Sequence, residues 1–127
     1  MRVALVLILL SVGLETRATD FNTGIAPILT KFGCNSGPCH GAAVGRGGFR
    51  LSLYGGDPAR DYEQIVFELE GRRVNFARPA ESLLFLKPTE SLNHGGGLRF
   101  DIESEAAEML IAWIQTGAPR NANSRLD

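Results

Sequence analysis

Apolar residues near the start of the chain recur at the spacing of one helix face. Successive members are four, three, one and three residues apart, and they are Phe21, Ile25, Ile28, Leu29 and Phe32. This spacing predicts a short amphipathic helix. Pro27 lies inside the pattern, so the helix either begins near Gly24 with proline in its first turn or is kinked at the proline. Gly33 is expected to end it.

The middle of the chain predicts a strand followed by a helix. Residues 49–54 alternate apolar and polar side chains, as a half-buried strand does. After a turn at residues 55–58, Asp57 can cap a helix that has Pro58 at its first position. We expect this helix to reach about Leu69 and to bury Tyr62, Ile65, Val66 and Leu69. Gly71 closes it, and residues 72–75 are expected to be briefly extended.

The second half predicts two more helices. Residues 79–86 suit a short helix that Pro88 stops, and residues 89–100 form a loop that contains His94 and three glycines in a row. The last helix is the clearest, since Ser104 can cap it and its apolar stripe consists of Ala107, Leu110, Ile111 and Ile114. Gly117 and Pro119 end it. These elements together predict a mainly α domain.

The first twenty residues resemble a secretory signal. Arg2 is a positive start, an apolar run follows from Val3 to Leu14, and small residues lie near Ala18. We expect residues 1–18 to be a signal peptide and residues 19–127 to be one exported domain, periplasmic or otherwise extracytoplasmic. The run is short for a membrane span, although failed cleavage would leave an N-terminal anchor.

Composition and charge narrow the classes of partner. A chain of 127 residues, 44% of them hydrophobic, has the size of one domain with a real core. Removing residues 1–18 leaves 11 basic and 13 acidic residues, a net charge of −2. So weak a balance provides no electrostatic surface for nucleic acid or for an anionic membrane. Partners have to be inferred from a site.

The chemistry lies in the string Cys34-Asn35-Ser36-Gly37-Pro38-Cys39-His40, which holds the only two cysteines of the chain. A pair of cysteines followed by histidine is typical of covalent haem attachment, with the histidine against the iron. Haem motifs usually have two residues between the cysteines, whereas this one has four. The two extra residues must loop out, and Gly37-Pro38 is a turn-forming pair suited to that.

Two other interpretations of these residues stay open. The cysteines could form a local disulfide, although closing so short a loop removes little chain entropy. They could also join His40 and His94 in a zinc site. We favour haem c, because a glycine-rich stretch at residues 41–48 permits close approach of a large flat group. The chain also offers a second axial ligand.

The second axial ligand is expected to be His94, with Met109 as the alternative. His94 lies in a glycine-rich loop from which its imidazole could reach iron, whereas a methionine within a helix is ordinarily a packing residue. The alternative for His94 without a functional role is an ordinary loop histidine that faces solvent. Arg46, Arg50 and Arg99 are candidates to neutralise the haem propionates, although a solvated surface arginine is commoner.

Three stretches, FGCNSGPCHGAAVGRGGFR at residues 32–50, NHGGGLRF at 93–100 and WIQTGAP at 113–119, resemble a known family. They are similar to the cytochrome c domains that precede large uncharacterised regions in secreted planctomycete-type proteins. The resemblance spans almost all of residues 19–127. It implies a cytochrome c-like single-haem fold with an inserted strand and helix segment at about 49–75. It also implies covalent haem on Cys34 and Cys39, with His40 proximal and His94 distal.

The function expected from this site is outer-sphere electron transfer to a redox protein partner that the sequence does not identify. We expect an electron carrier rather than an enzyme. Two alternatives belong to other classes. One is a haem enzyme with an open distal position, and the other is a haem-free secreted interaction module with a Cys34–Cys39 disulfide.

Overall fold

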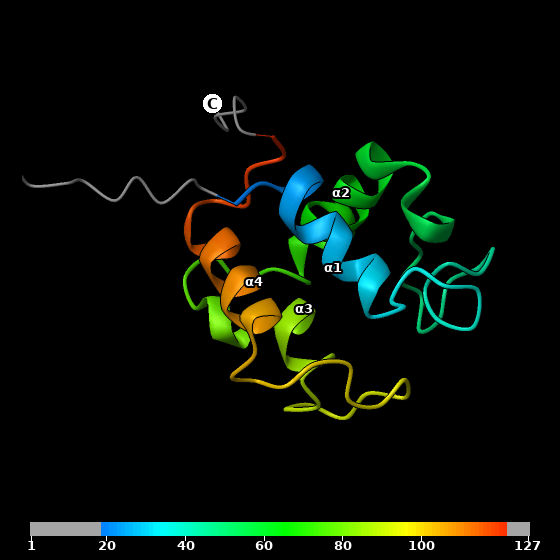
Figure 1. Ribbon diagram of the computed structural model, residues 1–127. Helices are drawn as coiled ribbons and strands as arrows, with labels where there is room; N and C mark the ends of the chain where they lie inside the picture. The colour runs from blue at the N-terminus through cyan, green and yellow to red at the C-terminus, as the bar shows by residue number, and fades with distance from the viewer. Residues whose placement is uncertain (1–18, 122–127) are drawn as a thin grey trace, which may run out of the picture.

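Helical turns provide the regular structure of residues 19–121, which are the residues that the computed structural model describes (Figure 1). The prediction of a mainly α chain is therefore confirmed. The expected signal peptide, residues 1–18, lies outside the described residues. None of the helices in residues 19–121 has the length and continuous apolar character that a transmembrane span needs.

The first helical segment begins at Phe21, so the alternative in which the helix starts near Gly24 is wrong. A π-helical turn, η1 (Phe21–Ile25), leads directly into α1 (Ala26–Lys31). The Asp20 side chain caps η1 by accepting a hydrogen bond of 2.8 Å from the Thr23 amide. Because Pro27 has no N–H to donate, the regular hydrogen-bond ladder is interrupted at this point. The proline thus lies at a change of helix type rather than at the start of a helix beginning near Gly24.

The strand predicted at residues 49–54 is wrong. The segment ends in a single 3₁₀ turn, η2 (Leu53–Gly55), and its backbone amides bond to separate neighbours instead of to one partner strand. The Leu51 amide donates to the His40 carbonyl at 2.7 Å, and the Ser52 amide donates to the buried Asp61 carboxylate at 2.6 Å. Alternation along a chain makes a strand only where a second strand can pair with it.

The second helix is shorter than predicted. Helix α2 (Pro58–Val66) is capped by Asp57 as expected and buries Tyr62, Ile65 and Val66. Leu69, expected in its buried face, instead lies in the 3₁₀ segment η3 (Glu68–Gly71) and is 55% exposed. Leu69, Glu70 and Gly71 all have positive φ angles, which reverse the chain. Residues 72–73 continue as a turn rather than as extended chain.

The helix predicted at residues 79–86 is divided in two. A 3₁₀ turn, η4 (Pro79–Glu81), precedes the single turn α3 (Leu83–Leu86). Ser82 between them has an extended backbone and is fully buried. Its hydroxyl accepts a hydrogen bond of 2.9 Å from the Asn75 amide, which fixes the break.

The last helix, α4 (Glu105–Gln115), matches its prediction. Ser104 caps it, since its hydroxyl accepts from the Ala107 amide. Its buried face includes Ala107, Leu110 and Ile114, whereas Ile111 is only partly buried. Gly117 and Ala118 leave the helix with positive φ angles, as a helix C-terminus commonly does.

One cluster of buried side chains joins both ends of the described chain. Trp113 of α4 is completely buried against the rings of Phe21 and Tyr62. The Trp113 indole donates a hydrogen bond of 2.9 Å to the Pro119 carbonyl, and the Tyr62 hydroxyl donates one of 2.7 Å to the Ala118 carbonyl. In Figure 1, α4 (orange) consequently lies beside the η1–α1 segment (blue). Trp113 is thus a core residue.

Candidate functional site

A cavity of about 480 Å³ opens between the loop after α1 and the loop before α4. Residues of both loops line it, and side chains from the helices form its apolar floor. The floor includes Ile25, Ile28, Leu29, Leu83, Leu84 and Leu110. The two cysteines and the two histidines of the chain, which the sequence singles out as candidate haem-binding residues, also line this cavity: Cys34, Cys39, His40 and His94.

Local hydrogen bonds hold the cysteine loop in a bulge. Gly37 and Pro38 are the central residues of a turn in which the Cys39 amide donates to the Ser36 carbonyl at 3.1 Å. The His40 amide then donates to the Cys34 carbonyl at 2.9 Å, so the chain returns to the first cysteine six residues later. Gly41 is required here, because a Cβ at that position would overlap the Asn35 carbonyl oxygen.

Cys34 and Cys39 are both free and partly buried. Burial raises the pKa of the Cys34 thiol to about 11, and the positive charge of Arg99 partly opposes this increase. The Arg99 guanidinium also donates a hydrogen bond of 3.3 Å to the Cys39 sulfur. Cys34 is therefore held as a neutral thiol at neutral pH.

The His40 ring is fixed by Phe49. Its Nδ1 lies 3.0 Å from the Phe49 carbonyl oxygen, and the two rings are 4.6 Å apart between centroids. Because a carbonyl oxygen only accepts, Nδ1 must carry the proton. Burial lowers the pKa of His40, which favours the neutral imidazole. The second nitrogen, Nε2, then has a free lone pair.

His94 is held in the same way by its own loop. Its Nδ1 lies 2.8 Å from the Gly97 carbonyl oxygen and must therefore be the donor. The Gly97 amide donates back to the His94 carbonyl at 2.8 Å, and Gly97 has a positive φ angle that this tight turn requires. In the neutral ring Nε2 is again the free nitrogen.

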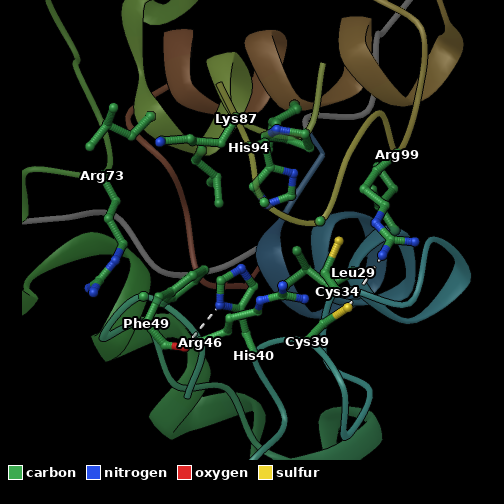
Figure 2. Close-up of a pocket in the computed structure, with 18 of the residues that line it drawn as sticks. Leu29, Cys34, Cys39, His40, Arg46, Phe49, Arg73, Lys87, His94 and Arg99 are labelled. Carbon is green, nitrogen blue, oxygen red and sulfur yellow. Dashed lines mark hydrogen bonds between the residues drawn. The ribbon is translucent and has the colours of Figure 1, made fainter. Parts of the chain in front are cut away.

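The two imidazoles face each other across the cavity. Their centroids are 6.3 Å apart and their planes differ by 21°. Figure 2 shows His40 and His94 in the middle of the cavity, with a ring nitrogen of each turned toward the other ring. The cysteines and Arg99 lie on one side of this pair and Arg73 lies on the other. Residues more than fifty positions apart in sequence thus meet at one point.

Basic side chains surround the cavity, and no Asp or Glu is among the described residues that line it. The lining cations are Arg46, Arg72, Arg73, Lys87 and Arg99. Two predicted residues are not brought there. Arg50 is exposed outside the lining, and the Met109 side chain faces Gly24 of η1. The charge of the lining suits an anionic ligand.

The far side of this cavity is not predicted from the sequence. The alternation at residues 49–54 places Phe49 in a strand, and no motif singles out the basic residues Arg72, Arg73 and Lys87. The two consecutive arginines after Gly71 can be recognised in the sequence as a local concentration of positive charge. The sequence does not indicate, however, that the chain reverses direction just before them and so brings them to the cavity. Those contacts depend on the left-handed turn at Leu69 and Glu70.

Within residues 19–121, no three His, Cys, Asp or Glu side chains are grouped closely enough to hold a metal ion. A structural zinc site needs four such ligands. A haem iron needs only two, since the porphyrin supplies the rest.

Comparisons with known protein families, with characterised proteins and with solved structures found no match to this chain.

Proposed function

We propose that this protein is a c-type cytochrome domain that carries one haem between His40 and His94 and transfers electrons. The observation that carries the proposal is the opposed histidine pair, in which each Nδ1 is bonded to a carbonyl and each Nε2 is free. Metal-ligating histidines typically donate their other nitrogen to a backbone carbonyl or a carboxylate. Two such rings, with centroids 6.3 Å apart, leave room for one ion between them.

The spacing of the rings supports this proposal. A metal ion between two imidazoles has bonds of about 2 Å on each side. Adding the distance from each nitrogen to the centre of its ring gives a separation close to the observed 6.3 Å. The nearly parallel planes are compatible with two ligands on one axis. The ligands would be the two histidines that sequence reasoning favours, rather than Met109.

The cysteines and basic residues fit the rest of a haem. Both sulfurs lie at the wall next to His40, where thioether bonds to the two vinyl groups would form. Arg46, Arg72 and Lys87 offer positive charge for the two carboxylates, whereas the Arg73 guanidinium is already paired with Glu68. Arg99 contacts Cys39 and lies on the cysteine side. Since a haem carries its propionates on the edge away from its vinyl groups, Arg99 is poorly placed for the propionate role that the sequence suggests.

The proposal includes a cytochrome c-like fold with residues 49–75 inserted. In support, the cysteine loop follows the first helix, and the His94 loop precedes the last one. The proposal also includes export and an acceptor or donor protein as redox partner. The order of elements and the family resemblance in three stretches of sequence support these points.

Bound haem supplies one-electron chemistry at its iron. The contribution of the chain would be to hold the His40 and His94 rings in place, so that little moves when the charge at the site changes. The bonds from His40 to Phe49 and from His94 to Gly97 fix the ring orientations. Leu29 and Leu110 in the apolar floor keep water away. Bis-histidine ligation favours a lower reduction potential than histidine–methionine ligation.

An electron carrier is favoured over a haem enzyme because His94 faces the position that an enzyme would need open. A haem-free module with a disulfide finds no support in two free cysteines. The test is the ferric absorption and EPR spectrum of His94→Ala after maturation. Wild type is expected to be low-spin, and the variant is expected to become high-spin.

The matched control is Met109→Leu, which removes the other candidate ligand. Its spectrum should equal that of wild type. A His94→Ala variant that stays low-spin with an unchanged spectrum contradicts the assignment of His94. A wild-type spectrum that is already high-spin would favour the enzyme alternative instead.

A further inference from the structure

Phe49 contacts His40 with both its backbone and its ring, and a third residue holds Phe49. The Arg73 guanidinium lies over the Phe49 ring, with its central carbon 4.3 Å from the ring centroid. The Phe49 ring in turn lies against the imidazole of His40. Arg73, Phe49 and His40 therefore form a continuous row of planar groups on one side of the cavity (Figure 2).

Arg73 is anchored from three directions. One guanidinium nitrogen, Nη1, donates to the Gln64 carbonyl at 2.6 Å and to the Glu68 carboxylate at 2.7 Å. The other, Nη2, donates to the Gly48 carbonyl at 3.3 Å. Only 7% of the residue is exposed, so these contacts are made away from most of the solvent. Because the guanidinium is planar and its donors are fixed in direction, lysine could not make all of them.

The contact with Gly48 matters because Gly48 precedes Phe49. Arg73 thus restrains Phe49 twice. Its hydrogen bond to the Gly48 carbonyl holds the backbone just before Phe49, and its guanidinium covers the Phe49 ring. Phe49 is also the residue whose carbonyl accepts the hydrogen bond from Nδ1–H of His40. Holding Phe49 in place keeps its carbonyl aimed at Nδ1, and this keeps Nε2 turned into the cavity.

We propose that Arg73 is a positioning residue that sets the orientation and tautomer of His40 through Phe49. The inference rests on the proposed function only in naming His40 as a ligand. The contacts themselves belong to the chain without haem. Glu68 extends the same arrangement, because its ion pair with Arg73 orients the guanidinium.

The test is ¹⁵N NMR of the histidine rings in the haem-free full chain at pH 8, where the His40 imidazole is neutral. Wild type should show His40 as a single Nδ1–H tautomer with a slowly exchanging ring proton. Arg73→Lys and Arg73→Gln should both show a mixture of tautomers and about tenfold faster exchange of that proton, as expected for the loss of one hydrogen bond.

Arg73→Lys is the decisive variant, because it keeps the charge and loses the planar contacts. Rescue by lysine would mean that charge alone acts, and it would overturn the proposal. Arg78→Lys is the matched control, since Arg78 makes an exposed ion pair with Glu81 and does not line the cavity. It should leave the His40 signals unchanged.

If Arg73 variants fail to fold, Phe49→Leu provides a second test. It keeps the carbonyl but removes the ring between Arg73 and His40, so the same tautomer mixture is expected. An unchanged His40 tautomer in a folded Arg73→Gln or Phe49→Leu chain overturns the inference. These outcomes are independent of haem, so failure to bind haem would count against the proposed function and not against this one.

Haem-loaded protein gives a further readout. Loosening the bond from Nδ1 to the Phe49 carbonyl makes His40 a weaker electron donor to iron. Arg73→Lys should therefore have a higher midpoint potential than wild type, whereas Arg78→Lys should not. An equal potential in wild type and Arg73→Lys would contradict a role for Arg73 in positioning the ligand.

Discussion

Each histidine in the site is held by a hydrogen bond to a backbone carbonyl. The Phe49 carbonyl accepts from Nδ1 of His40 and the Gly97 carbonyl accepts from Nδ1 of His94, so each ring has its proton on Nδ1. The free Nε2 is the atom that can bind iron. His40 is also partly buried, and this disfavours its protonated form. For His40, the structure therefore favours the neutral imidazole that metal binding requires.

This burial predicts how the stability of the haem-free chain depends on pH. The pKa of His40 is lowered in the folded state, so the unfolded chain binds the proton more readily. The free energy of unfolding should therefore be highest above pH 6.5 and should fall as the pH decreases below that value. Urea denaturation at a series of pH values measures this.

The control is His40→Asn, which cannot titrate. Between pH 8 and pH 5, its unfolding free energy should fall less than that of wild type. An identical decrease in the two proteins would show that His40 is not the group responsible.

At the scale of single residues, the sequence singles out the cysteines and histidines that line the cavity, but not the residues that hold them in place. Cys34, Cys39 and His40 are contiguous, so a local motif suffices to find them. Phe49 and Arg73 act through contacts with residues well separated from them in the chain. No periodicity in the sequence encodes which aromatic ring a buried arginine will cover.

Among the elements, the turn after α2 departs most from ordinary backbone geometry. Leu69 and Glu70 have φ angles of 53° and 59°, and Gly71 follows with 70°. Residues other than glycine adopt this region at a cost of about 1–2 kcal/mol each. These three residues reverse the direction of the chain, so that Arg72 and Arg73 reach the cavity.

Glu70→Gly should therefore stabilise the protein, by about 1 kcal/mol after the entropy of the unfolded chain is taken into account. The matched control is Glu63→Gly in α2, an exposed helical position where the same change should destabilise by about 1 kcal/mol. Thermal unfolding of both variants checks the opposite signs. A destabilised Glu70→Gly would mean that the glutamate side chain contributes more than the strain costs.

How well an element could be predicted depended on how local its causes are. Helix α4 has its cap, its apolar stripe and its end within sixteen residues, and all of them are confirmed. The segment at 49–54 has the alternation of a strand but no partner strand among the described residues. Its amides bond to His40, Asp61 and Asn35 instead, and this choice is set by the fold as a whole.

For the whole molecule, the net charge conceals the site. The chain has a formal charge of −1, yet five basic residues and no acidic one line the cavity in the part of the chain described. The balance predicts no strongly charged partner, and it cannot reveal a local concentration of arginine. That concentration arises because four separate segments converge around two histidines.

The most direct measurement of the central claim is the intact mass of the protein after expression with a c-type maturation system. Wild type should gain the mass of one haem that survives denaturation, because in the proposed site Cys34 and Cys39 would hold it by covalent bonds. The double variant Cys34→Ala, Cys39→Ala should gain none. Wild-type protein that carries no covalent haem under these conditions would contradict the account.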